Sequence, residues 1–411
     1  MSVKIAPLLL GRICSGWRTI ALSTPRLWSS IHVPEPYAKL PQYVRDGCLQ
    51  LMKTWLTRSG GLPLSISFHK RHPPGSSPFL DTIVSLSSRW KHISLSGQNR
   101  IQLSRADVPI LKSIEVSDYV VGDGPTETRD FFCGVAVRKV SIGTDLDPIQ
   151  LPLPWAQLTA LSLHRPSDPH LFSQSSLTSN LSSSTALTIL AECRSLCECT
   201  LFLSPSADET IAPPSSVELP LLASLKISVI ACGGSLLQQH DPLDRLLLPQ
   251  LSSFALTGYR ANPVGIPLST LVSNATKLQN VEVDTTFFTR ETLVTFIRLL
   301  PPCVQHLILR QNVICPNAPS FVDNDFLLLL TPPSQRVDGS DAGFLFPELD
   351  TIQLIYTAAF SDEALLGFIR ARMGVHRLGR VRVKFLRYVE RDILPELRSF
   401  IDEFGLSVSL E

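Results

Sequence analysis

The chain has 411 residues, a net charge of +1 and 18% charged residues, so no excess of charge points to a nucleic-acid or membrane-surface partner. Hydrophobic residues make up 44% of it, enough for a large core in two or three domains or in one extended repeat domain. The nine cysteines are irregularly spaced and no secretory signal or bilayer-length apolar run is recognised, which predicts a cytoplasmic or nuclear protein without a membrane contact.

Two short helices are predicted within residues 6–33. Thr24 is the N-cap candidate of the second, and Pro25 takes its first helical position. In the first, apolar residues step by four, four and three positions, which places them on one face. They are Leu9, Ile13, Trp17 and Ile20. The pattern leaves open whether Trp17 and Trp28 belong to a small core, to a helix that caps later elements, or to a partner contact.

A longer helix is predicted in "VRDGCLQLMKTWLTRSGG", where Gly60 and Gly61 end it. We expect residues 34–61 to form a linker and a helix that caps a repeat array.

From about Leu62 onwards, two apolar residues separated by one residue recur along the chain. Most steps between these pairs are 21–29 residues, with two longer steps of 40 and 45. Ten of the thirteen pairs also have an apolar residue three positions earlier, and the exceptions have Pro63, Glu198 and Gly405 there. The pairs are Ile66/Phe68, Ile93/Leu95, Ile114/Val116, Val140/Ile142, Leu161/Leu163, Leu201/Leu203, Leu225/Ile227, Phe254/Leu256, Val281/Val283, Leu307/Leu309, Ile352/Leu354, Val381/Val383 and Val408/Leu410.

This spacing predicts one short strand and one return segment in each repeat. Because a single repeat cannot bury its apolar edge, we expect the repeats to stack into a parallel-stranded solenoid. The predicted fold class is therefore α/β, a leucine-rich-repeat-like solenoid over residues 62–411 with return helices or loops. Thr289 and Ser361 are N-cap candidates of two return helices, and a flexible insertion is expected at 311–345.

The residue between the members of each pair points away from the core, because side chains alternate along a strand. We expect these residues to line the concave face, and among them we nominate a partner-binding set. Phe202 and Ile308 are its candidate anchors, since exposed apolar groups dominate interface energies. The set is Phe202, Lys226, Glu282, Ile308, Gln353 and Arg382.

Other clusters give weaker signals. The spacing of Cys193, Cys197 and Cys199 matches no common zinc site, which favours buried thiols over a metal. The basic stretch 370–391 could meet an acidic partner or form the polar face of a terminal helix and strand, and its few aromatic residues disfavour nucleic acid. With no nucleotide-binding or Ser-His-Asp pattern in view, we expect no metal, no cofactor and no enzymatic activity.

The stretch "LGRICSGWRTIALSTPRLWSSI" resembles the later helices of the F-box in a large fungal, basidiomycete-type family of F-box proteins. "WLTRSGGLPLSISF", "SRWKHISLSG" and "LRSFIDEFGLSVSL" also resemble that family. The Leu-Pro-x-Glu helix that begins the family's F-box has no counterpart here, so the resemblance implies an all-α partial F-box at 1–33 that lacks its first half.

The resemblance implies a non-catalytic subunit that recognises an unidentified protein substrate for a cullin-type ubiquitin ligase. It would bind a Skp-type adaptor through five residues. These are Leu9, Ile13, Trp17, Leu27 and Trp28. The alternative is a stand-alone repeat scaffold that binds a protein without a ligase, and a metal-assisted enzyme built on the cysteine cluster is a third hypothesis.

Overall fold

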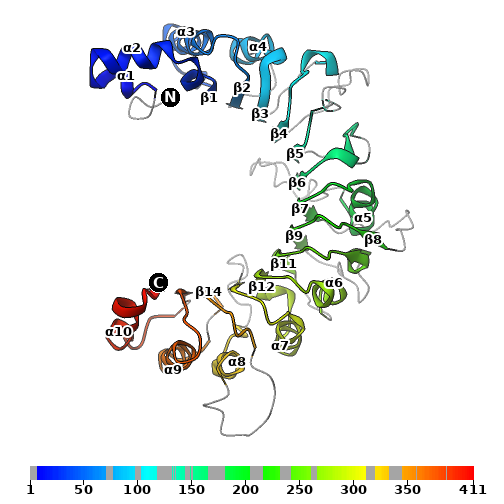
Figure 1. Ribbon diagram of the computed structural model, residues 1–411, viewed down its shortest axis with the longest axis vertical. Helices are drawn as coiled ribbons and strands as arrows, with labels where there is room; N and C mark the ends of the chain where they lie inside the picture. Colours follow the sequence, from blue (N-terminus) through cyan, green and yellow to red (C-terminus); the bar gives the residue numbers. More distant parts are fainter. Residues whose placement is uncertain are drawn as a thin grey trace. The chain divides into compact units, whose positions relative to one another are not determined.

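The computed structural model describes all residues except 1–6, 71–76, 98–102, 118–131, 133, 135, 144–148, 150, 165–180, 204–215, 232–241, 261–265, 312–319, 333–344, 358 and 386. The chain divides into two compact units, Met1–Asn180 and Leu181–Glu411. Within each unit, parallel strands lie side by side along one face, and helices and turns lie on the other (Figure 1). Among the described residues, no helix is long and apolar enough to cross a membrane.

Among its described residues, the first unit contains six parallel strands in chain order. The strands are β1 (Ser30–Pro34), β2 (Leu64–His69), β3 (Trp90–Ser96), β4 (Ser113–Val116), β5 (Lys139–Gly143) and β6 (Ala160–His164). The helices are α1 (Leu10–Ile13), α2 (Ser15–Ser23), α3 (Gln42–Arg58) and α4 (Pro78–Val84), with 3-10 turns η1 (Pro25–Trp28), η2 (Ser87–Arg89), η3 (Arg105–Asp107) and η6 (Trp155–Gln157).

The described part of the second unit contains eight parallel strands in its main sheet, again in chain order, and a small parallel pair. The main strands are β7 (Glu198–Leu203), β9 (Ser224–Ala231), β11 (Ser253–Arg260), β12 (Asn280–Asp284), β13 (His306–Arg310), β14 (Thr351–Ile355), β15 (Arg380–Lys384) and β16 (Ser407–Leu410); the small pair is β8 (Val217–Glu218) and β10 (Leu246–Leu247). The helices are α5 (Ser183–Glu192), α6 (Ser269–Asn274), α7 (Arg290–Leu299), α8 (Asn324–Leu329), α9 (Asp362–Met373) and α10 (Leu394–Phe404), with turns η9 (Pro242–Arg245) and η10 (Thr285–Phe287).

All thirteen predicted apolar pairs lie in these parallel strands, which confirms the α/β, leucine-rich-repeat-like fold class. Their side chains are buried in the strands from β2 to β15, and neighbouring pairs are in register, as for Ile66 opposite Ile93. The apolar residue three positions before the pair is also buried. Examples are Leu111, Leu158, Leu251 and Leu278. Most repeats therefore give three side chains to the core, while in the last one Gly405 precedes the pair and Val408 and Leu410 are only half-buried.

The phase of strand β7 differs from the prediction. Cys199 lies opposite Leu225, so the in-phase pair is Cys199 and Leu201 instead of Leu201 and Leu203. The residue three positions before Cys199 is Leu196, which is fully buried. The repeat of β7 therefore does have an apolar residue three positions before its pair, and Glu198 is no longer an exception. The pair was not recognised because its first member is a buried thiol instead of an aliphatic side chain.

Strand β1 adds a repeat upstream of Leu62. Ile31 lies opposite Ile66, and Trp28 precedes Ile31 by three positions, as Trp90 precedes Ile93. The two tryptophans make the same hydrogen bond: each indole Nε1 donates to the carbonyl seven residues earlier, near the end of the preceding helix, at 2.7 Å for Trp28 and 3.2 Å for Trp90. The segment that resembles a partial F-box thus ends in the first repeat strand, not in a helix.

The predicted N-terminal helix is divided at Cys14, whose backbone is extended (φ −157°, ψ 173°). The Arg18 Nε atom donates to the Gly11 carbonyl at 2.8 Å, which ties α2 to α1 across this break. Thr24 precedes a single 3-10 turn, and its side chain does not cap that turn.

The helix signals downstream are confirmed. Thr289 accepts a hydrogen bond from the Thr292 amide, and Ser361 accepts one from the Ala364 amide, so both residues cap their helices. Helix α3 ends before Gly60, whose φ of +57° is a conformation that favours glycine.

The expected insertion at 311–345 contains a regular helix, since residues 320–332 are described and include α8. Arg372 on α9 joins the two flanks of residues 333–344, which lie outside the described part. Its Nε donates to the Leu330 carbonyl at 2.7 Å, and its Nη atoms donate to Phe346 and Leu345 at 2.7 and 2.8 Å. The side chain is fully buried, and burial lowers its pKa to about 10.

We predict that Arg372→Met lowers the free energy of unfolding by about 3 kcal/mol, because three buried carbonyls lose a charged donor. Arg370→Met is the matched control, since Arg370 makes a surface ion pair with Glu396 that is worth less than about 1 kcal/mol. Urea unfolding followed by circular dichroism measures both values, and equal losses would contradict the assignment.

The Asp362 carboxylate is expected to make the stability of the fold sensitive to acid. Burial opposes its ionisation, but hydrogen bonds from Arg387 and from the Arg391 and Glu390 amides outweigh it, so its pKa lies below the ordinary value of 3.8. A lowered folded-state pKa stabilises the fold above about pH 4 and loses that effect as pH falls further. We expect Asp362→Asn to be less stable near neutral pH and to show a shallower loss between about pH 4 and pH 2. Thermal unfolding across that range measures it, and parallel curves for the two proteins would contradict the role.

Candidate interaction surfaces

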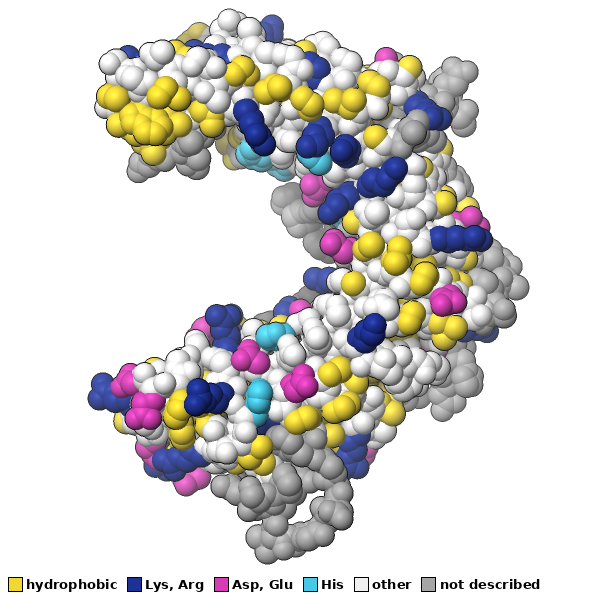
Figure 2. Space-filling view, in the orientation of Figure 1, with side chains coloured by type: hydrophobic (Ala, Val, Ile, Leu, Met, Phe, Trp, Pro, Cys, Tyr) yellow, Lys and Arg dark blue, Asp and Glu magenta, His cyan; other side chains and the backbone are white. Residues whose placement is uncertain are grey.

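Helices α1 and α2 expose a group of large apolar side chains, which we call the α1–α2 surface. Each is between 43 and 57% exposed, and hydrophobic side chains gather at this end of the first unit in Figure 2. They are Leu9, Ile13, Trp17, Ile20 and Leu22. Trp17 and Ile20 are three positions apart on α2 and therefore share one face. Exposed apolar groups at this density are typical of interaction sites.

The charged residues in the segment that carries the α1–α2 surface have one sign. Residues 7–29 contain Arg12, Arg18 and Arg26 and no acidic residue. An apolar patch with a basic rim fits a partner surface that is apolar at its centre and acidic at its edge.

The structure separates the five adaptor-binding candidates. Leu9, Ile13 and Trp17 are exposed, Leu27 is half-buried, and Trp28 is only 3% exposed. The Trp28 indole packs edge-on against Trp55 at 4.9 Å. Trp28 is therefore a core residue of the first repeat, where it packs against helix α3.

Sequence reasoning omitted Ile20 and Leu22 from the candidate set. Ile20 carried a usable signal, because the steps of four, four and three place it on the helix face of Trp17. Leu22 carried none, since its position in that pattern lies off this face.

The nominated partner-binding residues lie on the open strand face of the second unit, the face opposite its helices. All six are half-buried or exposed. Lys226, Glu282, Ile308, Gln353 and Arg382 occupy one row of the register. Phe202 lies in the next row, opposite Ser228, as a consequence of the shifted phase of β7. In the row of Lys226, strand β7 places Thr200.

Many of the charged side chains on this face form ion pairs with one another. Glu282 binds Arg310 at 2.6 Å, and Glu411 binds Arg382 at 3.0 Å and Lys384 at 2.9 Å. Hydrogen bonds from Lys384, Ser409 and Arg382 lower the pKa of Glu411 to about 2. Glu282 and Arg382 therefore serve contacts between neighbouring strands, while Phe202 and Ile308 keep partly exposed apolar surface.

The basic stretch 370–391 is largely used inside the fold. Arg387 pairs with the buried Asp362 at 2.6 Å, and Arg391 binds Glu363 at 3.0 Å. The Arg377 guanidinium lies 4.5 Å from the centre of the Phe404 ring. These contacts join neighbouring repeats, which accounts for much of the positive charge without an external partner.

Two of the three cysteines of the cluster lie in the core, and Cys197 is half-buried. Cys193 and Cys199 are buried, and burial raises the pKa of the Cys193 thiol to about 12 and moves that of Cys199 in the same direction. Both remain neutral thiols at ordinary pH. In the part of the chain that the structure describes, no three His, Cys, Asp or Glu side chains are grouped as a metal ion requires.

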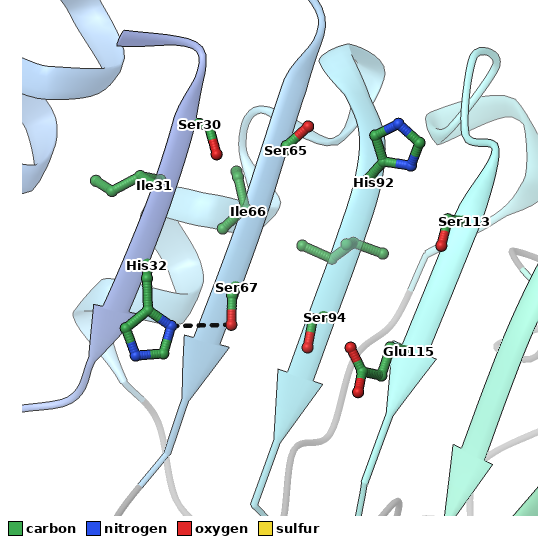
Figure 3. A pocket seen from close by; sticks show the side chains of 11 residues that line it. Ser30, Ile31, His32, Ser65, Ile66, Ser67, His92, Ser94, Ser113 and Glu115 are labelled. Atoms are coloured by element: carbon green, nitrogen blue, oxygen red, sulfur yellow. Dashed lines mark hydrogen bonds between the residues drawn. The ribbon is translucent and has the colours of Figure 1, made fainter. Parts of the chain in front are cut away.

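A pocket on the open strand face of the first unit was not nominated from the sequence. It spans β1 to β4, has a volume of about 280 Å³ and is lined by serines, His32, His92 and Glu115 (Figure 3). The His32 Nδ1 and Ser67 Oγ atoms are 3.0 Å apart across the first two strands. The alternation rule placed Ser67, Ser94 and Glu115 on this face, but small side chains gave no reason to prefer them as a site.

We predict that replacing the two N-terminal tryptophans changes the free energy of unfolding to very different extents. Trp28→Ala should lower the free energy of unfolding by about 3–5 kcal/mol, because it empties a buried position of the first repeat. Trp17→Ala should change it by less than about 0.5 kcal/mol, since that side chain is half exposed. Urea titration of both variants provides the measurement, and a larger loss for Trp17→Ala would contradict the assignment of Trp28 to the core.

In comparisons with known proteins, neither a family model nor a curated protein matches the chain.

Proposed function

We propose that this protein is a non-catalytic recognition subunit. The α1–α2 surface would bind a Skp-type adaptor of a cullin-type ubiquitin ligase, and the strand faces of the repeats would bind a protein substrate. The observation that carries the proposal is the group of five exposed apolar side chains on the two helices that precede the first repeat. The resemblance of these helices to the later part of an F-box supplies the identity of the adaptor.

The distribution of charge supports the same assignment. Three arginines and no acid surround the apolar group within residues 7–29, so the surface fits an apolar groove with an acidic rim. The repeats suit the second task, because stacked strands present a long row of outward side chains whose identity does not affect the core.

A stand-alone scaffold is the second candidate function, and the position of Trp28 favours it. Since Trp28 and β1 form the first repeat, the segment that resembles an F-box also completes the array. In this reading α1 and α2 shield the end of the core, and the protein captures a partner without a ligase.

We predict that the purified chain forms a complex with a Skp-type adaptor, measured by size-exclusion chromatography and calorimetry. The double variant Trp17→Asp/Ile20→Asp should weaken the affinity at least tenfold, roughly, because it places two charges in an apolar interface. Leu51→Asp is the matched control, since Leu51 is 64% exposed on α3, outside the α1–α2 surface, and the affinity should not change.

Deletion of residues 1–33 is not a suitable test, because it removes Trp28 and β1 together with the surface. If the full chain does not bind, either alone or with a Leu-Pro-x-Glu helix fused upstream, the ligase assignment is wrong. An interaction with a protein partner that survives the double variant would then support the scaffold.

A further inference from the structure

The open strand face of the first unit combines a pocket with positive charge that has no ion-pair partner among the described residues. The pocket on β1 to β4 is lined by small hydroxyl side chains such as Ser67 and Ser94, by His32 and His92, and by one acid, Glu115. Figure 3 shows these side chains on four neighbouring strands, on the same face of the sheet. Because the outward side chains are small, another polypeptide could approach the strands closely.

Three exposed lysines lie around His92 at the amino ends of the strands. Lys139 is the outward residue beside Ser113, which itself lies beside His92. Lys91 precedes His92 directly, and Lys112 precedes Ser113 directly. Figure 2 shows lysine and arginine side chains beside the histidines of this unit. Among the described residues, no ion pair involves Lys91, Lys112 or Lys139, so their charges are not neutralised there by this chain.

This arrangement differs from the strand face of the second unit. There, Arg310 binds Glu282 on the neighbouring strand β12, and Arg382 and Lys384 bind Glu411, which directly follows strand β16. Three like charges held close together repel one another, and an anion from outside would relieve that repulsion. Burial and the charges of Lys91, Lys112 and Lys139 lower the pKa of His92, which is consistent with a positive potential at this position.

We propose that this face binds an extended acidic segment of a partner protein, with aspartate or glutamate side chains on Lys91, Lys112 and Lys139 and with the serine and histidine side chains of the pocket as hydrogen-bonding groups. The proposal deepens the proposed function, since it locates the substrate on the first unit and gives its chemistry. The three lysine-bearing strands span about 10 Å, which an extended segment crosses in about three residues.

A protein segment fits this face better than a nucleic acid. The side chains of the pocket are serine, histidine, isoleucine and glutamate, so it offers no phenylalanine, tyrosine or tryptophan on which bases would stack. Glu115 faces the same pocket, and its carboxylate would repel a continuous chain of phosphates. A peptide avoids this conflict by placing a neutral residue opposite Glu115.

The test uses fluorescence anisotropy of the full chain with a short labelled peptide in which Glu and Ser alternate. Binding should weaken as salt rises from about 50 to about 200 mM. Lys112→Glu/Lys139→Glu should reduce the affinity roughly tenfold or more, and Glu115→Gln should raise it. The control is Lys53→Glu combined with Lys277→Glu, which changes the net charge equally at exposed positions outside this face.

An equal loss in the control, or no binding of the peptide, would overturn the proposal, as would tighter binding of a single-stranded RNA with the same net charge. The outcome is independent of the ligase assignment. The Lys112/Lys139 variant should still bind the Skp-type adaptor, and the Trp17/Ile20 variant should still bind the peptide.

Discussion

The structure depends on burial of the inward apolar side chains of the main-sheet strands from β1 to β15, usually three in each repeat. No single repeat can cover its own row, so each strand is stable only beside the next one, and the parallel register places like side chains opposite each other. Trp28 and Trp90 show how strict this position is. Each is the third residue before its strand pair, and each indole satisfies a carbonyl near the end of the helix that precedes it.

The same constraint leaves the opposite side of every strand free to vary. An outward residue contributes little to the core, so serine, lysine, glutamate or isoleucine fits there equally well. In the second unit this freedom is used for ion pairs between strands, such as Glu282 with Arg310. In the first unit it leaves a pocket flanked by lysines. The N-terminal segment is divided in a similar way, since Trp28 points into the core while Trp17 and Ile20 face solvent.

The fold could be predicted from the sequence because its signal is local and repeated. The apolar pairs at 21–29 residue spacing locate thirteen strands, and the caps Thr289 and Ser361 start helices as expected. Two errors have physical causes. The phase of β7 was missed because Cys199 was not counted as an apolar side chain, and β1 was missed because one pair, Ile31 and Val33, carries no period by itself.

The candidate sites could be predicted only in part. Alternation along a strand predicts whether a side chain faces the core or the open face of the sheet. It placed Lys226, Ile308 and Gln353 correctly on an outward row. It does not give the neighbours, because paired residues on adjacent strands are between 21 and 45 positions apart in the sequence. The structure is therefore needed to recognise that Arg382 pairs with Glu411 and that three lysines lie around His92.

The central claim is that the array begins at Trp28 and β1, so that the exposed helices α1 and α2 are held on its first repeat. Hydrogen exchange followed by mass spectrometry tests it directly. The Glu35 amide donates to the His69 carbonyl at 2.9 Å and the Ser65 amide to the Ser29 carbonyl at 2.9 Å, which joins β1 to β2. Peptides covering 30–35 should therefore exchange far more slowly than an unstructured chain, although less slowly than peptides covering 64–69, because among the described strands β1 pairs on one side only and β2 on both. Exchange of 30–35 at the rate of an unstructured chain, with 64–69 protected, would contradict the account.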